Sequence, residues 1–119
     1  MMSERMRTPV THAMSLQDAP FRAMAEGRKT VELRLYDEKR QAIRPGDTIV
    51  FTAPAGETVT VRVEALERFD SFAELYAALD PAELGYGPDE AADPWDMEAY
   101  YSPAQQEKYG VVGICVRLV

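Results

Sequence analysis

The chain has 119 residues, of which 46% are hydrophobic and 28% are charged, a composition that predicts one folded domain and excludes a disordered chain. Its 20 acidic and 13 basic side chains give a formal net charge of -7. This acidic balance argues against a general coat for nucleic acid, because nonspecific binding depends on cations that release counterions from phosphates.

The N-terminal part of the chain predicts a tail, a strand and a short helix. Residues 1–8 carry no periodic pattern and are expected to form a flexible tail, which leaves 9–119 as a single domain. A weakly patterned strand is expected over 11–16. Asp18 fits the N-cap of a short helix that Gly27 ends.

The middle of the chain predicts three strands. Polar and apolar residues alternate over 30–36, which is typical of a half-buried strand with one polar face. A polar connection, 37–44, leads to a second strand at 48–52. A third strand at 58–65 follows a loop with the composition of a hairpin turn, 53–57, so we expect these two strands to pair antiparallel.

The remaining sequence predicts short helices before a last strand. A capping box at 71–74 begins one helix, and the acidic segment 80–93 is irregular. Pro94 and Pro103 each lie in the first turn of a further helix, and a strand follows at 111–118. Hairpin-like neighbours without regular βαβ alternation favour an α+β fold around a small mixed or antiparallel barrel.

Several kinds of site and location are disfavoured. Cys115 lies in an apolar run and is expected to be a buried, unreactive thiol. His12 is the one histidine, so the ligands that zinc requires are missing, and we expect neither a metal nor a cofactor. No apolar run approaches the roughly 20 residues of a membrane helix, and the start lacks a signal-peptide core. We therefore expect a cytoplasmic protein with no membrane partner.

The stretch 27–34, GRKTVELR, places an ordered series of charges on a predicted strand. Residues two apart on a strand share a face, so Glu32 and Arg34 are neighbours, with Lys29 at the strand entry. One interpretation is a solvated face with weak ion pairs of about 0 to 1 kcal/mol. The other is a ligand cleft in which cations bind phosphate or carboxylate, while Glu32 accepts from a base or exchanges a proton with Lys29.

The same stretch resembles the G-x-K-x-x-E-x-R motif of the ASCH domain, a small relative of the PUA-like RNA-binding fold. The resemblance extends from about His12 onward. It implies a five- or six-stranded β-barrel with flanking short helices and a cleft lined by Lys29, Glu32 and Arg34. Further runs resemble a bacterial branch of this family, namely 32–40, 45–51, 68–72, 100–102 and 109–114.

The resemblance implies that the partner is single-stranded RNA or a nucleotide or nucleoside ligand. It also offers two enzymatic alternatives: an amidohydrolase acting on an acylated nucleoside, and a metal-dependent ribonuclease that needs clustered carboxylates. The amidohydrolase branch has a threonine nucleophile where this chain has Glu32, and the nearest hydroxyl, on Thr30, shows no aligned base. If the protein is an enzyme, Lys29 and Glu32 are its catalytic candidates.

Four more residues complete the predicted ligand-binding set. Arg40 would extend a phosphate track, Arg68 would be a cation in the cleft, and Tyr101 and Tyr109 would stack bases, worth roughly 1 to 3 kcal/mol each. Each has a structural alternative, as a solvated cation or as an aromatic residue in the core or at the rim. The sequence leaves open the oligomeric state and whether the acidic segment 80–93 covers the cleft as a lid.

Overall fold

The structure is a computed structural model that describes residues 8–119, so the predicted tail lies outside the described residues except for its last position. Five strands form one mixed sheet in the order β1-β3-β4-β5-β2. The β1–β3 pair is parallel and the other three pairs are antiparallel. The strands are β1 (Thr11–Ser15), β2 (Val31–Leu35), β3 (Thr48–Thr52), β4 (Thr58–Phe69) and β5 (Val111–Leu118).

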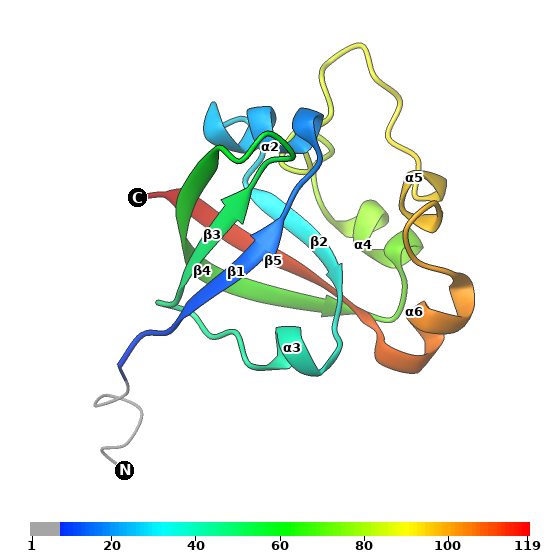
Figure 1. Ribbon diagram of the computed structural model, residues 1–119. Coiled ribbons are helices and arrows are strands. Elements are labelled where there is room, and N and C mark those ends of the chain that lie inside the picture. Colours follow the sequence, from blue (N-terminus) through cyan, green and yellow to red (C-terminus); the bar gives the residue numbers. More distant parts are fainter. Residues whose placement is uncertain (1–7) are drawn as a thin grey trace.

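Short helices surround the curled sheet (Figure 1). Helices α2 and α3 lie at opposite ends of the sheet, and α4, α5 and α6 lie together on one side. Within residues 8–119, no helix is long and apolar enough to cross a membrane. The helices are α2 (Asp18–Ala25), α3 (Glu38–Gln41), α4 (Phe72–Ala78), α5 (Trp95–Glu98) and α6 (Pro103–Tyr109). The predicted α+β fold with short flanking helices is confirmed, and the expected barrel is a curled sheet of five strands whose end strands, β1 and β2, do not pair with each other within residues 8–119.

Strand β4 is longer than the sequence pattern predicted. It pairs antiparallel with β3, as expected, but continues to Phe69 instead of ending at Ala65. A register shift between Val63 and Ala65 marks a bulge in its pairing with β5. An extra residue at a bulge reverses the inward and outward alternation, which is why the second half of the strand was not recognised.

The predicted helix starts agree with the structure at α4 and α6, where a serine side chain caps the first turn. The Ser71 hydroxyl accepts from the backbone N–H of Glu74 at the start of α4. At α6, Ser102 and Gln105 form both reciprocal bonds of the box, and Gly110 caps the end with a positive φ of 71°. These local bonds begin and end the helices where the sequence indicated.

Two helix predictions were wrong in detail. Gln17, not Asp18, is the N-cap of α2, and it makes no side-chain capping bond. The connection 37–44 contains α3, whose N-cap, Asp37, accepts from the backbone N–H of Arg40. A four-residue helix is too short to show periodicity, so its only sequence mark was the capping aspartate.

Two hydrophobic clusters pack on opposite faces of the sheet. One cluster joins α2 to β1, β3, β4 and β5, with Ile49 and Phe51 completely buried. The other packs α4 against the odd-numbered residues of β2. Val31, Leu33 and Leu35 are therefore committed to the second cluster, and Glu32 and Arg34 point the other way, toward β1.

The predicted buried cysteine is only partly buried. Cys115 has intermediate exposure, and its Sγ lies 3.7 Å from a carboxylate oxygen of Glu67. Burial and the nearby Glu67 carboxylate raise the pKa of Cys115 to about 11. The thiol therefore stays protonated near neutral pH, in agreement with the unreactive role expected of it.

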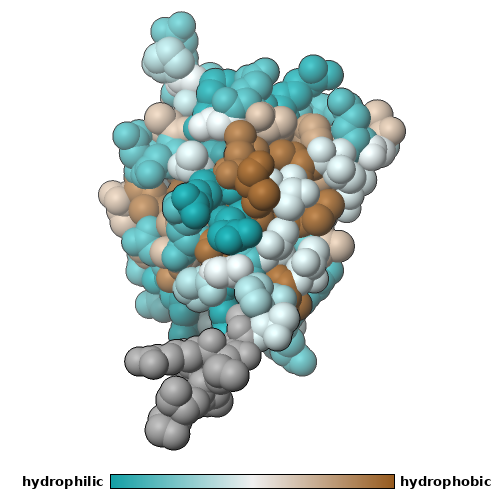
Figure 2. All heavy atoms as spheres, turned by 90° about the vertical axis from the view of Figure 1, so that its left-hand side faces the viewer, coloured by the Kyte–Doolittle hydropathy of each residue, from teal (hydrophilic) through white to brown (hydrophobic). Residues whose placement is uncertain are grey.

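The surface at the end of β5 carries exposed apolar side chains. Leu118 and Val119 are both exposed at the C-terminal end of the chain. Figure 2 faces this side of the molecule and shows hydrophobic residues gathered near its middle, bordered by hydrophilic ones. Exposed apolar atoms of this kind are common on folded domains and carry no functional conclusion.

Asp47 fastens the start of β1 to the turn before β3. Its carboxylate is completely buried and accepts from the backbone N–H groups of Val10 and Arg44, each at 3.0 Å. The Nε2 atom of His12 lies 2.8 Å from its second oxygen. The lone histidine thus has a structural partner, and the buried carboxylate satisfies donors from two distant segments.

We expect Asp47→Ala to lower the free energy of unfolding by about 3 kcal/mol, because it removes a completely buried carboxylate that accepts from the backbone of two segments. Urea unfolding followed by circular dichroism measures the loss. The control is Asp89→Ala, which removes an exposed aspartate in the acidic segment and should change stability by less than about 0.5 kcal/mol. Equal effects of the two changes would contradict the role given to Asp47.

Candidate functional site

The polar face of β2 forms the floor of a cavity of about 570 Å³ at the gap between β1 and β2. This gap, called the seam below, separates the two end strands of the sheet. The end of β1, the loop after β3 and the segment 97–101 supply the walls. The lining residues are Ser15, Leu16, Gln17, Pro20, Lys29, Glu32, Leu33, Arg34, Thr52, Ala53, Pro54, Met97, Tyr100 and Tyr101.

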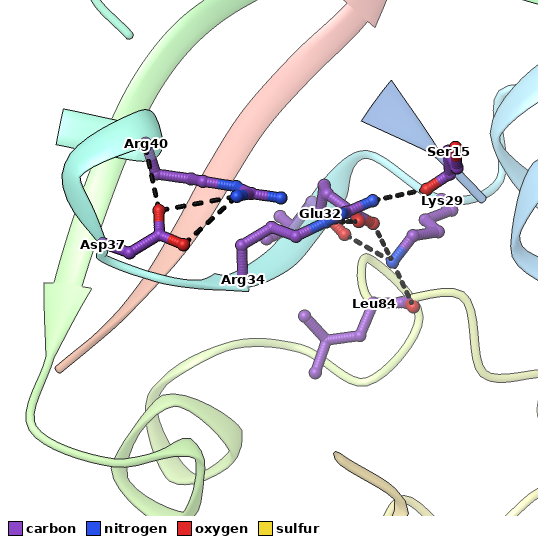
Figure 3. Close-up of polar contacts among 8 residues, drawn as sticks. Ser15, Lys29, Glu32, Arg34, Asp37, Arg40 and Leu84 are labelled. Carbon is purple, nitrogen blue, oxygen red and sulfur yellow. Dashed lines mark hydrogen bonds and ion pairs between the residues drawn. The ribbon is translucent and has the colours of Figure 1, made fainter. Parts of the chain in front are cut away.

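Glu32 lies between two cations on this floor (Figure 3). Its Oε1 lies 3.4 Å from Nζ of Lys29, and its Oε2 accepts from Nε of Arg34 at 2.5 Å. Lys29 is 5% exposed and Glu32 4% exposed. The interpretation as a solvated face with weak surface pairs is therefore wrong for these two residues, since burial requires charged groups to be paired.

All three N–H donors of the Lys29 ammonium have acceptors inside the protein. Nζ donates to the backbone carbonyls of Val31, at 2.8 Å, and of Leu84, at 3.2 Å, and the third acceptor is Glu32. The acidic segment packs closely on this side chain, because a Cβ on Gly85 would lie 3.3 Å from Cδ of Lys29. Lys29 therefore acts as a brace between β2 and the acidic segment.

The acidic segment does not cover the cavity as a lid. The backbone carbonyl of Glu83 accepts from the N–H groups of Thr30 and Val31, which docks the segment at the entry of β2. Within the described chain, none of the residues 80–93 lines the cavity. On this side the wall of the cavity is formed by residues that follow the acidic segment, Met97, Tyr100 and Tyr101.

Burial and ion pairing shift the pKa values of Lys29 and Arg34 in opposite directions. Burial lowers the pKa of Lys29 from its ordinary value of 10.5, and the attraction of Glu32 offsets this only in part. Burial also acts to lower the pKa of Arg34, but the charge of Glu32 and the contact with Tyr101 outweigh it and raise that pKa. Arg34 is thus a permanent cation, while Lys29 gives up its proton more readily than an exposed lysine.

Arg34 connects β2 to β1 across the seam. Its Nη2 donates to the backbone carbonyl of Ser15 at 2.6 Å, and the nearby Tyr101 side chain contributes to its raised pKa. Together with Glu32, these contacts occupy only part of the five-donor fork. The remaining donors of this side chain, which lines the cavity, are placed to contact a ligand.

Two adjacent tyrosines form an aromatic wall. The Tyr101 ring stacks on Phe72, with ring centroids 5.7 Å apart, so it is largely committed to the protein. Tyr100 also lines the cavity and is 61% exposed, so its ring is free to meet a planar ligand. Sequence reasoning selected Tyr101 but missed Tyr100, and the adjacent pair of tyrosines was the pattern that would have identified it.

A chain of hydrogen bonds holds α5 beside this wall. The hydroxyls of Tyr76 in α4 and Tyr86 in the acidic segment lie 2.8 Å apart, and the Tyr86 hydroxyl donates to Asp96 of α5 at 2.6 Å. Burial, reinforced by the bond to Asp96, raises the pKa of Tyr86. The phenol therefore stays a donor, and α4 fixes the position of the segment that ends in Tyr100 and Tyr101.

The structure brings together four of the seven predicted site residues: Lys29, Glu32, Arg34 and Tyr101. A fifth, Arg40, lies next to them and lines a smaller hollow of about 310 Å³ that also includes Arg34. Here the fold extends the predicted group of cations into a neighbouring site.

Arg68 and Tyr109 lie apart from this cavity. Both line a different hollow of about 850 Å³ near α6, where the Arg68 guanidinium lies 4.3 Å from the Tyr36 ring centroid. The Nζ atom of Lys108 lies over the Tyr109 ring. Arg68 lies in this other hollow because β4 continues past its bulge to Phe69. The position of Arg68 just before the capping box in the sequence did not indicate this.

The cavity offers few of the side chains that the two enzymatic alternatives require. Within residues 8–119, no three His, Cys, Asp or Glu side chains are grouped to hold a metal ion. Glu32 is the one carboxylate among the residues that line the cavity of the described chain. The Thr30 hydroxyl, considered as a nucleophile, belongs to a residue outside this lining.

The fold and this site define a small α+β domain with a charged cavity at the seam of its sheet. A model of the ASCH domain family matches residues 14–118, nearly the whole chain. The protein therefore belongs to the ASCH domain family.

Solved structures of similar proteins agree with this membership. The crystal structure of the hypothetical protein PH0355 is 28% identical, with a TM-score of 0.78, over 92% of this chain and 99% of that one. The solution structure of protein PF0455 from Pyrococcus furiosus is 29% identical, with a TM-score of 0.66, over 92% and 97%. An ASCH protein from Zymomonas mobilis shares the fold at 16% identity and a TM-score of 0.66, over 90% and 66%. No curated protein is similar enough in sequence to count as a match.

We expect Lys29→Met to change how stability depends on pH. The folded pKa of Lys29 lies below the unfolded value of 10.5, so between these two values the unfolded state binds more protons. The stability of the parent relative to the variant should therefore rise with pH across that window. Urea unfolding at about pH 7 and about pH 10 measures the difference.

The exposed Lys39 provides the matched control, because Lys39→Met removes a lysine that remains in water. The effect of this control on the free energy of unfolding, measured at the same two pH values, is the reference for loss of an exposed lysine. The same pH dependence in both variants would mean that Lys29 is not buried as a charged group.

Proposed function

We propose that the cavity binds one nucleotide unit, either free or at the end of a single-stranded RNA. The observation that carries this proposal is the anchored Arg34–Glu32 pair on the floor of a cavity with the exposed Tyr100 ring in its wall. Aromatic rings take the face of an unstacked base, and a guanidinium and a carboxylate recognise its polar edge or the ribose hydroxyls.

Charge and size favour a compact ligand over a long polyanion. The volume of about 570 Å³ lies in the range of small-molecule sites. The lining charges are Lys29, Arg34 and Glu32, a local excess of one positive charge in a chain of net charge -7. A long RNA would need a row of cations along its phosphates. The three charged side chains in this cavity are enough for one nucleotide only.

The roles of the two cations differ from the sequence hypothesis that both bind phosphate. The donors of Lys29 are used by Val31, Leu84 and Glu32, so Lys29 serves to position the carboxylate. Arg34 is the cation with donors left for a ligand. We therefore propose Arg34, Glu32 and Tyr100 as the contact residues, with Lys29 and Tyr101 holding them in place.

The test is calorimetric titration with the four ribonucleosides, their monophosphates and a short mixed-sequence RNA at about 50 and 200 mM salt. Tyr100→Ala should weaken binding about tenfold or more through lost stacking, with unchanged stability because the ring is exposed. Arg34→Gln should weaken every ligand that the parent binds. Lys29→Met should weaken binding while the salt dependence is retained.

The matched control is Trp95→Ala, which removes a second exposed aromatic ring that lies outside the cavity lining. Its binding should equal that of the parent. The proposal fails if no nucleoside, nucleotide or RNA binds at the highest attainable concentration, or if Trp95→Ala and Tyr100→Ala weaken binding equally.

One observation favours the amidohydrolase alternative. Lys29, with its lowered pKa, lies 3.4 Å from Glu32 at a cavity floor, an arrangement found in general acid–base sites. A carboxylate in place of the threonine hydroxyl would form an anhydride at an amide carbonyl, which speaks against this chemistry. The metal-dependent ribonuclease has no group of metal-binding side chains in the described part of the chain to support it.

Membership of a bacterial branch and a cytoplasmic location stay predictions from the sequence.

We expect acylated nucleosides to come back unchanged after long incubation with the protein, as read by mass spectrometry. Glu32→Gln, which keeps the shape of the side chain and removes its charge, is the comparison. Loss of the acyl group with the parent but not with Glu32→Gln would replace the binding proposal with the hydrolase.

A further inference from the structure

We infer that the smaller hollow beside the cavity is a phosphate subsite, so that the ligand carries a terminal phosphate next to its base and sugar. This inference rests on the proposed nucleotide-binding function. The hollow has a volume of about 310 Å³ and shares Ser15, Arg34 and Thr52 with the main cavity. A ligand seated in the cavity therefore has direct access to it.

Three cations line this hollow, and the acids beside them do not balance their charge. Arg34 comes from β2, and Lys39 and Arg40 come from α3. The acids paired with these cations are Glu32, on Arg34, and Asp37, on Arg40 at 3.2 Å. The result is a local positive excess on an acidic chain, the pattern that attracts a compact anion.

The Arg40 side chain is partly buried, and its guanidinium is incompletely paired. Its side chain is 14% exposed, and Asp37 takes only Nη1. Nε is buried without a hydrogen-bond partner in the part of the chain that the structure describes. Figure 3 shows this side chain extending toward Arg34. Buried donors are rarely left unpaired, and two neighbouring guanidinium groups suit the several oxygens of a phosphate.

The backbone of β1 adds neutral donors to the same hollow. The Val10 carbonyl accepts from Thr48, and the Leu16 N–H donates to Thr52, so the even-numbered residues of β1 bond to β3. In a parallel pair the alternate residues turn their N–H and C=O groups the other way. Ala13 and Ser15, which line the hollow, therefore direct their backbone toward the seam, where Arg34 already uses the Ser15 carbonyl.

Two sources would supply the same group: a free nucleoside monophosphate, or the terminal phosphate of a short RNA. Both place a phosphate dianion one sugar away from a base. The shared chemistry is a terminal phosphate attached to a nucleoside, and the ligand length that binds best distinguishes the sources.

The experiment compares each nucleoside with its 5′- and 3′-monophosphate by calorimetric titration of the full chain. We expect at least one monophosphate to bind the parent at least tenfold more tightly than its nucleoside, a difference of about 1.4 kcal/mol. Arg40→Gln should abolish this preference and leave the affinity for the nucleoside unchanged. Lys39→Gln, at an exposed position, should reduce the preference without disturbing a buried side chain.

The matched control is Arg62→Gln, which removes the same charge from an exposed position on β4 and should retain the preference. Thermal melting of each variant checks that it is folded. A trinucleotide with and without a 5′-phosphate provides the second arm, and tighter binding of the phosphorylated trinucleotide than of the mononucleotide would identify an RNA end.

Each outcome distinguishes this inference from the proposal beneath it. Equal binding of nucleosides and monophosphates would overturn the phosphate subsite and leave the nucleotide-unit site standing. An equal loss of preference in Arg40→Gln and Arg62→Gln would show a general charge effect and also overturn the subsite. No binding of any of these ligands would overturn both.

Discussion

The buried carboxylate of Glu32 is the charge on which the arrangement of the site depends. A buried ion is stable only when it is paired, and the two partners that satisfy it are themselves tied to other parts of the chain. Through Lys29 the network reaches Leu84 and the acidic segment, and through Arg34 it reaches Ser15 in β1. One charge network thus joins β2 to β1 on one side and to the acidic segment on the other.

The site lies at the place where the sheet does not close. Strands β1 and β2 are the two ends of the sheet, and a side chain, Arg34, bridges them where backbone pairing would complete a barrel. Side-chain bridging leaves space and unpaired polar groups that a closed ladder would consume. The same incomplete closure gathers Arg34, Lys39 and Arg40 at one edge, so an acidic protein presents a local cationic site.

The strands β2 and β3 and the charged pair on β2 could be predicted from the sequence. Alternation placed β2 and β3 almost residue for residue, and it failed in β4 where a bulge between Val63 and Ala65 reverses it. The spacing of Glu32 and Arg34 correctly predicted that they are neighbours, because residues two apart on a strand always share a face. The same logic had no means of assigning Arg68 to another hollow, since that depends on where a long strand ends.

By itself, therefore, the sequence determined the elements with regular periods and the order of charges along β2, because both follow from the local geometry of the backbone. Only the tertiary structure decided what those charges do. Lys29 is a brace because a carbonyl 55 residues away accepts a hydrogen bond from its ammonium group, and Tyr100 joins the site because α4 and the acidic segment hold α5 in place. Such contacts depend on the packing of segments far apart in the chain, which no local pattern of residues encodes.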